Sequence, residues 1–219
     1  MIGDSLIILL HVLVPIYWLG GDLGAFYSSY FLIDPKRSVG ERMMALKLVN
    51  NIDMAPRTAM IMAIPTGLTA AAVRGWLPIG SEALVAIWVA GLIWLALAWA
   101  VHVRHDGTGK LLARIDLIVR VAVIVALLVL GIGGVVRDVA IPMFIALKLL
   151  ALATCIILGL VIRLQLKPLI PIIGAMATSG PTPQSDAALA SVLARARISV
   201  VAIWCAVLVA CYLGIAMPV

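Results

Sequence analysis

Six apolar runs, each long enough to cross a lipid bilayer, constrain this chain more than any other feature. They cover residues 5–33, 55–73, 83–103, 115–136, 141–163 and 198–217. A transmembrane helix needs about 20 mostly apolar residues. Hydrophobic residues make up 64% of the chain and charged residues 12%. In soluble domains, apolar residues average about 45–50% and charged residues about 25%. We therefore predict an all-α integral membrane protein, a single domain over residues 1–219 with about six transmembrane helices.

The connections between these runs differ in length and character. Residues 137–140 join the fourth and fifth runs as a tight antiparallel hairpin. The connection at 34–54 contains an amphipathic stretch at 41–49, which predicts a helix at the membrane interface. The connection at 167–197 has a turn-rich segment at 179–183, and the Ala/Leu stretch after it is expected to extend the last helix.

Basic residues are distributed unevenly between the connections, and this predicts the orientation. The first, third and fifth connections with their flanks carry twelve: Lys36, Arg37, Arg42, Lys47, Arg57, Arg104, Lys110, Arg114, Arg163, Lys167, Arg195 and Arg197. The second and fourth carry Arg74 and Arg137. By the positive-inside rule, the odd-numbered connections are cytoplasmic and both termini are extracytoplasmic. The same distribution explains the net charge of +6 without nucleic acid as a partner.

His11 and Lys148 are predicted to lie at one depth in the bilayer. Counted from the outer face, His11 is six residues into its run and Lys148 seven, which gives ~9 Å and ~10 Å at 1.5 Å per residue. Imidazole suits haem iron and copper, and a neutral lysine amine can also bind a metal. Two structural alternatives stay open: His11 hydrogen-bonds a neighbouring helix, or Lys148 extends to the outer interface.

A second polar group is expected nearer the cytoplasmic face. Asp116 and Arg120 are spaced i, i+4 and can pair along one helix face. Asp22, in the first predicted helix, could form an ion pair with Arg120 in the fourth. We favour a structural ion-pair network here over a catalytic one.

One segment of the first run resembles a known group of bacterial membrane proteins. It reads His11-Val-Leu-Val-Pro-Ile-Tyr17-Trp18-Leu-Gly20-Gly21, and the group includes the copper resistance protein D (CopD) family and the HemJ type of protoporphyrinogen oxidase. Residues 41–68 resemble the second-helix region of the HemJ type, including Thr66-Gly67-Leu68. Residues 144–168 are similar to the Lys-containing helix of the CopD family.

The resemblance implies a haem b site with a first-helix histidine and a lysine on a later helix, for which the matching positions are His11 and Lys148. It also implies the inner membrane of a bacterium. The HemJ type usually has four helices and an arginine after the Trp-Gly element, where this chain reads Phe26-Tyr27-Ser28-Ser29-Tyr30.

Three functions follow as hypotheses. The first is a haem b-binding inner-membrane protein in electron transfer or in oxidation of a small or lipophilic substrate, with quinone or a redox protein as partner. Its expected cofactor-binding residues are His11, Lys148, Trp18, Gly20 and Gly21, with His11 and Lys148 on the metal. The second is a copper-handling or copper-transport protein. The third is a non-catalytic membrane subunit of a larger complex or homo-oligomer.

Overall fold

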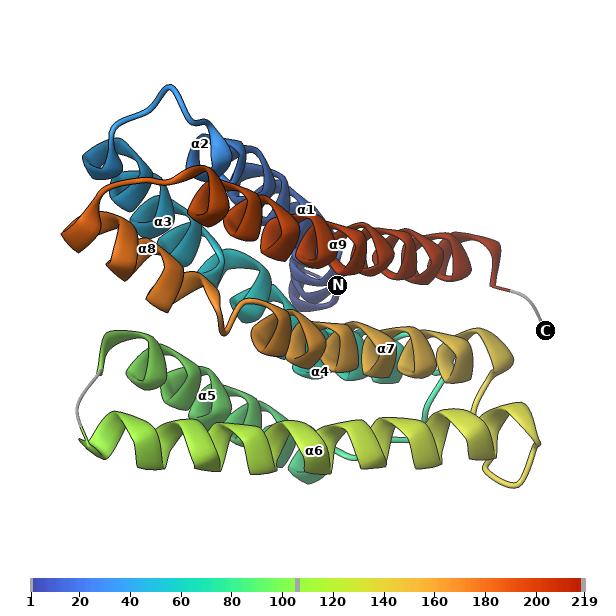
Figure 1. Cartoon of the computed structure of the whole chain (residues 1–219). Coiled ribbons are helices and arrows are strands. Elements are labelled where there is room, and N and C mark those ends of the chain that lie inside the picture. The colour runs from blue at the N-terminus through green and yellow to red at the C-terminus, as the bar shows by residue number, and fades with distance from the viewer. Residues whose placement is uncertain (1, 105–106, 218–219) are drawn as a thin grey trace.

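The computed structural model describes residues 2–104 and 107–217, which are mostly helical (Figure 1). The helices are α1 (Ile2–Ser28), α2 (Tyr30–Ile33), α3 (Val39–Ile52), α4 (Met54–Val73), α5 (Ser81–Val103), α6 (Gly107–Val135), α7 (Met143–Gln165), α8 (Leu169–Ser179) and α9 (Pro183–Ala216). The two described ranges contain no strand. The predicted all-α class is confirmed.

Five helical segments in the described ranges are long and apolar enough to cross a membrane. They are Gly3–Ile33, Ser81–Val103, Gly107–Val135, Met143–Ser179 and Pro183–Ala216. Large apolar side chains such as Ile93, Ile118 and Ile215 are exposed on them, and these are surfaces suited to lipid. The chain is therefore a multi-pass membrane protein. The remaining predicted span, 55–73, corresponds to α4, which Arg57 and two prolines make less apolar.

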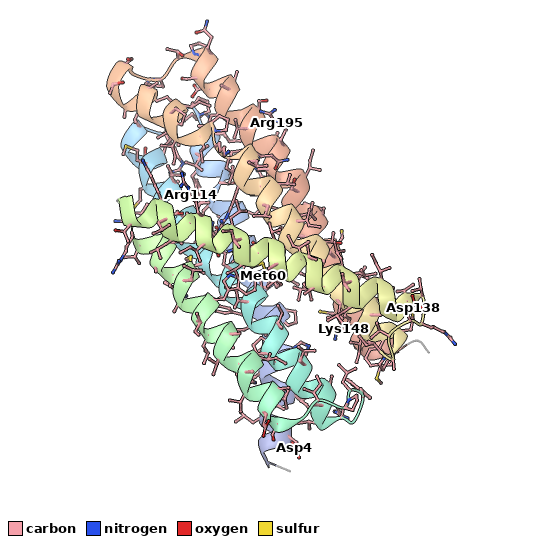
Figure 2. All side chains as sticks on the ribbon, turned by 90° about the horizontal axis from the view of Figure 1, so that it is seen from below. Asp4, Met60, Arg114, Asp138, Lys148 and Arg195 are labelled. Atoms are coloured by element: carbon pink, nitrogen blue, oxygen red, sulfur yellow. The ribbon has the colours of Figure 1, made fainter. Side chains whose placement is uncertain are left out.

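The long helices form two groups of three. In one group α4 packs between α1 and α5, and in the other α7 packs between α6 and α9. Contacts of α5 with α6 and of α1 with α9 join the groups. Figure 2 shows the groups diverging, one toward Asp4 and the other toward Asp138. The first turn of α1 and the last turn of α9 lie at these diverging ends.

Glycines allow close helix packing within each group. On α6, a Cβ at Gly134 would lie 2.7 Å from the Cβ of Ala146 in α7. On α1, a Cβ at Gly21 would lie 2.7 Å from the Cβ of Ala55 in α4. Small residues permit such approaches between membrane helices. The main core then spans both groups through Trp18, Trp94, Leu127, Ile156 and Ile203.

Away from the diverging ends, the short helices form a second core. Helices α2, α3 and α8 and the first turns of α9 enclose Leu32, Ala45, Ile173, Met176 and Leu189, and we call these four segments the helical cap (Figure 1). Nη1 of the buried Arg42 in α3 donates to Oδ1 of Asp186 in α9 at 2.6 Å. This ion pair fixes the first connection against the last.

Several boundaries differ from the sequence-based expectation. The fourth predicted helix begins at Gly107 rather than at residue 115, and the first is interrupted at Ser29, whose hydroxyl donates to the carbonyl of Phe26 at 2.6 Å. The last helix extends back to Pro183, as the Ala/Leu stretch predicts. Helix α8 was not predicted, because its apolar face packs on α3 and α9, which are distant in sequence.

Candidate functional site

Two cavities lie between the helices. The histidine cavity, of about 370 Å³, is lined by residues that include His11, Trp76, Lys148, Cys211 and Gly214. The arginine cavity, of about 550 Å³, lies nearer the cap and is lined by side chains that include Asp22, Arg57, Arg120, Arg163 and Arg197. Trp18 and Cys155 line both cavities, so these two side chains lie between them.

His11 of α1 is held in one orientation by α4. Its Nδ1 lies 3.0 Å from Oγ1 of Thr66, and this hydroxyl donates to the carbonyl of Met62 at 2.6 Å. A hydroxyl has one hydrogen, so Thr66 accepts a hydrogen bond from Nδ1–H of His11. In the neutral imidazole, Nε2 then carries a lone pair, as in a metal-binding histidine whose other nitrogen has a protein partner.

Gly67 allows the imidazole of His11 to pack against α4. A Cβ at Gly67 would lie 2.9 Å from Cε1 of His11, closer than non-bonded carbon atoms approach one another in proteins. The hydrogen bond to Thr66 is also the neighbouring-helix contact that the structural alternative for His11 predicts. That contact uses one ring nitrogen and leaves the other for a ligand.

Lys148 of α7 lines the histidine cavity from the other helix group, near the end marked by Asp138 (Figure 2). Its Nζ lies against α9, where a Cβ at Gly214 would be 3.0 Å away. None of the ion pairs found in the described ranges includes Lys148. The structure thus brings His11 and Lys148 to one cavity, as their predicted depths indicate, and their role as ligands stays a prediction.

The other three predicted cofactor-binding residues lie in different places. Trp18 is 5% exposed and lines both cavities. Gly20 is exposed, and a Cβ there would meet no atom within 4 Å. Gly21 packs against the start of α4. Neither glycine lines the histidine cavity. Arg74 of the second connection, predicted to be extracytoplasmic, does line this cavity.

Asp116 of α6 is at the centre of a buried charge network. Its Oδ2 accepts from Nε of Arg120 at 2.9 Å and from Nη1 of Arg163 at 3.1 Å, and its Oδ1 accepts from Nε1 of Trp94 at 3.1 Å. The predicted pair of Asp116 with Arg120 is confirmed. The predicted pair of Asp22 with Arg120 is wrong, since none of the ion pairs in the described ranges joins these two residues, and Oδ2 of Asp22 is buried without a hydrogen-bond partner. Arg163 of α7 takes that place because α7 packs against α6.

Two contributors to these sites were not identified from the sequence. Thr66 orients His11, and the available signal was its place in a motif resembling the HemJ type. Arg163 is assigned from the sequence to the flank of a cytoplasmic connection, although it is the last residue of the apolar run at 141–163. Both residues owe their roles to a partner on another helix.

Comparisons of the chain with family models, with curated proteins and with solved structures found no match. The resemblance to the CopD and HemJ groups therefore stays a prediction from short motifs. In the part of the chain that the structure describes, no three His, Cys, Asp or Glu side chains are grouped so that they could hold a metal ion. The donors that the histidine cavity offers to a cofactor include the imidazole of His11 and the amine of Lys148.

Proposed function

We propose that this protein binds haem b in the histidine cavity, with His11 as an axial ligand, and acts in electron transfer or in oxidation of a small or lipophilic substrate. The observation that carries the proposal is the orientation of His11. Thr66 engages Nδ1, and Nε2 keeps its lone pair beside an apolar cavity. The donor set fits haem, because the macrocycle supplies the equatorial nitrogens and the protein supplies axial ligands.

The other cavity residues support this assignment through their chemistry. Lys148 offers an amine as second axial ligand or as a polar partner. Arg74 offers a positive charge to the carboxylates of the cofactor, and Trp18 offers an aromatic surface. Bound haem would supply a one-electron redox centre. The apolar walls limit access of water to that centre, and we propose quinone or a redox protein as its electron partner.

We further propose that α4 is the sixth span and that both termini are extracytoplasmic, in the inner membrane of a bacterium. The 20 residues of α4 give ~30 Å at 1.5 Å per residue, which matches the hydrocarbon thickness. Helices α1 and α5 flank α4, and Arg57 near its start pairs with Asp53. Reporter fusions at Gly107 and Ser179 should be cytoplasmic, and a fusion after residue 219 extracytoplasmic. A cytoplasmic C-terminus would contradict this topology.

A visible spectrum tests the haem proposal. The protein should be expressed with a haem precursor in the medium and purified in a neutral detergent. We expect a Soret band and, in alkaline pyridine, the haemochrome of haem b at about one haem per chain. A folded protein without a Soret band after supplementation would contradict the proposal.

Copper handling is the second candidate, because the thiols of Cys155 and Cys211 line the histidine cavity with His11. Imidazole and thiolate are both copper ligands. Elemental analysis of the same sample separates the candidates: iron with a Soret band supports haem, and stoichiometric copper without one supports copper handling. If neither is present and other proteins co-purify, the chain is better explained as a non-catalytic subunit.

A further inference from the structure

The arginine cavity carries an excess of positive charge. The ionisable side chains of its lining include five cations, Lys47, Arg57, Arg120, Arg163 and Arg197, and two carboxylates, Asp22 and Asp53. Asp116 adds a third carboxylate behind the wall, bound to Arg120 and Arg163. The cavity lining and the wall behind it therefore hold five cationic side chains and three carboxylates. Much of the remaining lining is apolar and includes Leu46, Ile162, Leu193 and Ile203.

The carboxylates do not satisfy all of these cations. Arg57 pairs with Asp53, and Arg120 shares Asp116 with Arg163. Arg197 has no carboxylate among the ion pairs of the described ranges. Its Nε and Nη2 donate to the hydroxyl of Ser29 at 3.3 Å and 3.0 Å, and its guanidinium lies 3.8 Å from the ring centroid of Tyr30.

Arg120 has an incomplete set of partners although it is buried. Its side chain is 4% exposed, and only Nε contacts a carboxylate. Nη1 faces the thioether of Met60 at 3.8 Å, which is a weak acceptor. Nη2 is buried with no hydrogen-bond partner. A buried donor without an acceptor is unfavourable, most of all on a charged group, so this end of the cavity is suited to an anion.

We propose that the arginine cavity binds an amphipathic anion, namely a carboxylate or phosphate group on an apolar body. The acid group interacts with the guanidinium groups of Arg120 and Arg197, and the apolar body packs against the aliphatic walls. Asp22 lies in the same cavity, and its carboxylate opposes a bound anion. The site is distinct from the histidine cavity, so it stands whether or not that cavity holds haem.

Two membrane-derived sources share this chemistry: a free fatty acid and an anionic phospholipid. Native mass spectrometry of the full chain in a neutral detergent distinguishes them. The probes are oleate and dioleoyl phosphatidylglycerol, with methyl oleate and dioleoyl phosphatidylcholine as controls without net charge. We expect saturable binding of one molecule of at least one anionic probe, at least tenfold tighter than its control. Binding of oleate alone indicates a free carboxylate, and binding of phosphatidylglycerol alone indicates a lipid headgroup.

Matched variants locate the binding in this cavity. Arg120→Gln and Arg197→Gln should each weaken binding of the anionic probe about tenfold or more, because each removes a charged donor. Asp22→Asn should strengthen binding, an outcome that loss of folding cannot produce. Arg195→Gln is the control, since Arg195 is exposed on the same helix and lines neither cavity (Figure 2).

Three results would overturn the proposal. The first is the absence of saturable binding of either anionic probe. The second is equal affinity for oleate and methyl oleate and for the two phospholipids, which would show that only the apolar body is recognised. The third is equal weakening by Arg195→Gln and Arg197→Gln, which would show that binding depends on surface charge.

Discussion

Replacement of Asp116 by leucine should be the most damaging single change in the buried charge network. Asp116 is 0% exposed and accepts three hydrogen bonds of 2.9–3.1 Å, from Arg120, Arg163 and Trp94. Asp116→Leu would leave two guanidinium groups without a counter-charge. Removal of one partner from a buried ion pair typically lowers the free energy of unfolding by about 3–5 kcal/mol. We expect a loss in this range, mainly from the buried Arg120, because the side chain of Arg163 is 32% exposed and keeps contact with solvent.

Arg120→Leu should be milder, because Asp116 keeps its hydrogen bonds from Arg163 and Trp94. The expected loss is about 1.5–3 kcal/mol, which is typical of one hydrogen bond to a charged group. The double variant Arg120→Leu/Arg163→Leu leaves the carboxylate with Trp94 alone. Its loss should exceed the sum of the two single losses, since the two arginines share one partner.

Unfolding by sodium dodecyl sulfate in mixed micelles with dodecyl maltoside, followed by circular dichroism, measures these free energies. Arg195→Leu, at an exposed position outside the network, serves as control and should change stability by less than about 0.5 kcal/mol. If Arg120→Leu is as damaging as Asp116→Leu, or if the double variant is additive, Asp116 is not the shared centre of this network.

Three further predictions concern helix packing, the cap and the orientation of His11. Gly134→Ala should destabilise by about 1–3 kcal/mol, because the new Cβ would lie 2.7 Å from that of Ala146. Gly159→Ala, with no atom within 4 Å, should be neutral or stabilising in the same unfolding assay. Asp186→Asn removes the counter-charge of Arg42 and should speed proteolysis at residues 179–183, whereas an unchanged cleavage rate would argue against this ion pair as a fixing contact. Gly67→Ala should displace the imidazole of His11 and lower haem content per folded chain, and unchanged content would argue against this orientation.

The positions of the long helices could be predicted from the sequence for a physical reason. In lipid, backbone polar groups must be satisfied within the segment, so an apolar run of sufficient length is helical. The run predicted at 83–103 is the observed α5, Ser81–Val103. The same reasoning does not extend to α8, which contains Pro171 and is buried against distant segments of the cap.

For the candidate site, the sequence predicts how deep each residue lies along its helix, but not how each helix is rotated about its own axis. Depth follows from counting residues along a helix, and His11 and Lys148, which this count places at one depth, do line one cavity. Rotation depends on which face each helix turns to its neighbours. Trp18 and Gly20 are two residues apart and so about 200° apart around the axis, which is why the tryptophan lines the cavity and the glycine is exposed.

Ion pairs and hydrogen bonds between different helices could not be predicted from the sequence, for the same reason. The i, i+4 pair of Asp116 and Arg120 is set by one helix and could be predicted. The contribution of Arg163 depends on how α7 packs against α6, and the hydrogen bond from His11 to Thr66 depends on how α1 packs against α4.

The most direct test of the proposed function is the reduced-minus-oxidised visible spectrum of four proteins purified in parallel: the wild type, His11→Ala, Lys148→Met and Arg137→Gln. The wild type should show the bands of haem b, and His11→Ala should lose them because the iron loses its imidazole. Lys148→Met should retain haem with shifted bands, because a thioether is a softer donor than an amine. Arg137→Gln, outside the cavity, should match the wild type. A folded His11→Ala protein with the haem content and spectrum of the wild type would contradict the account.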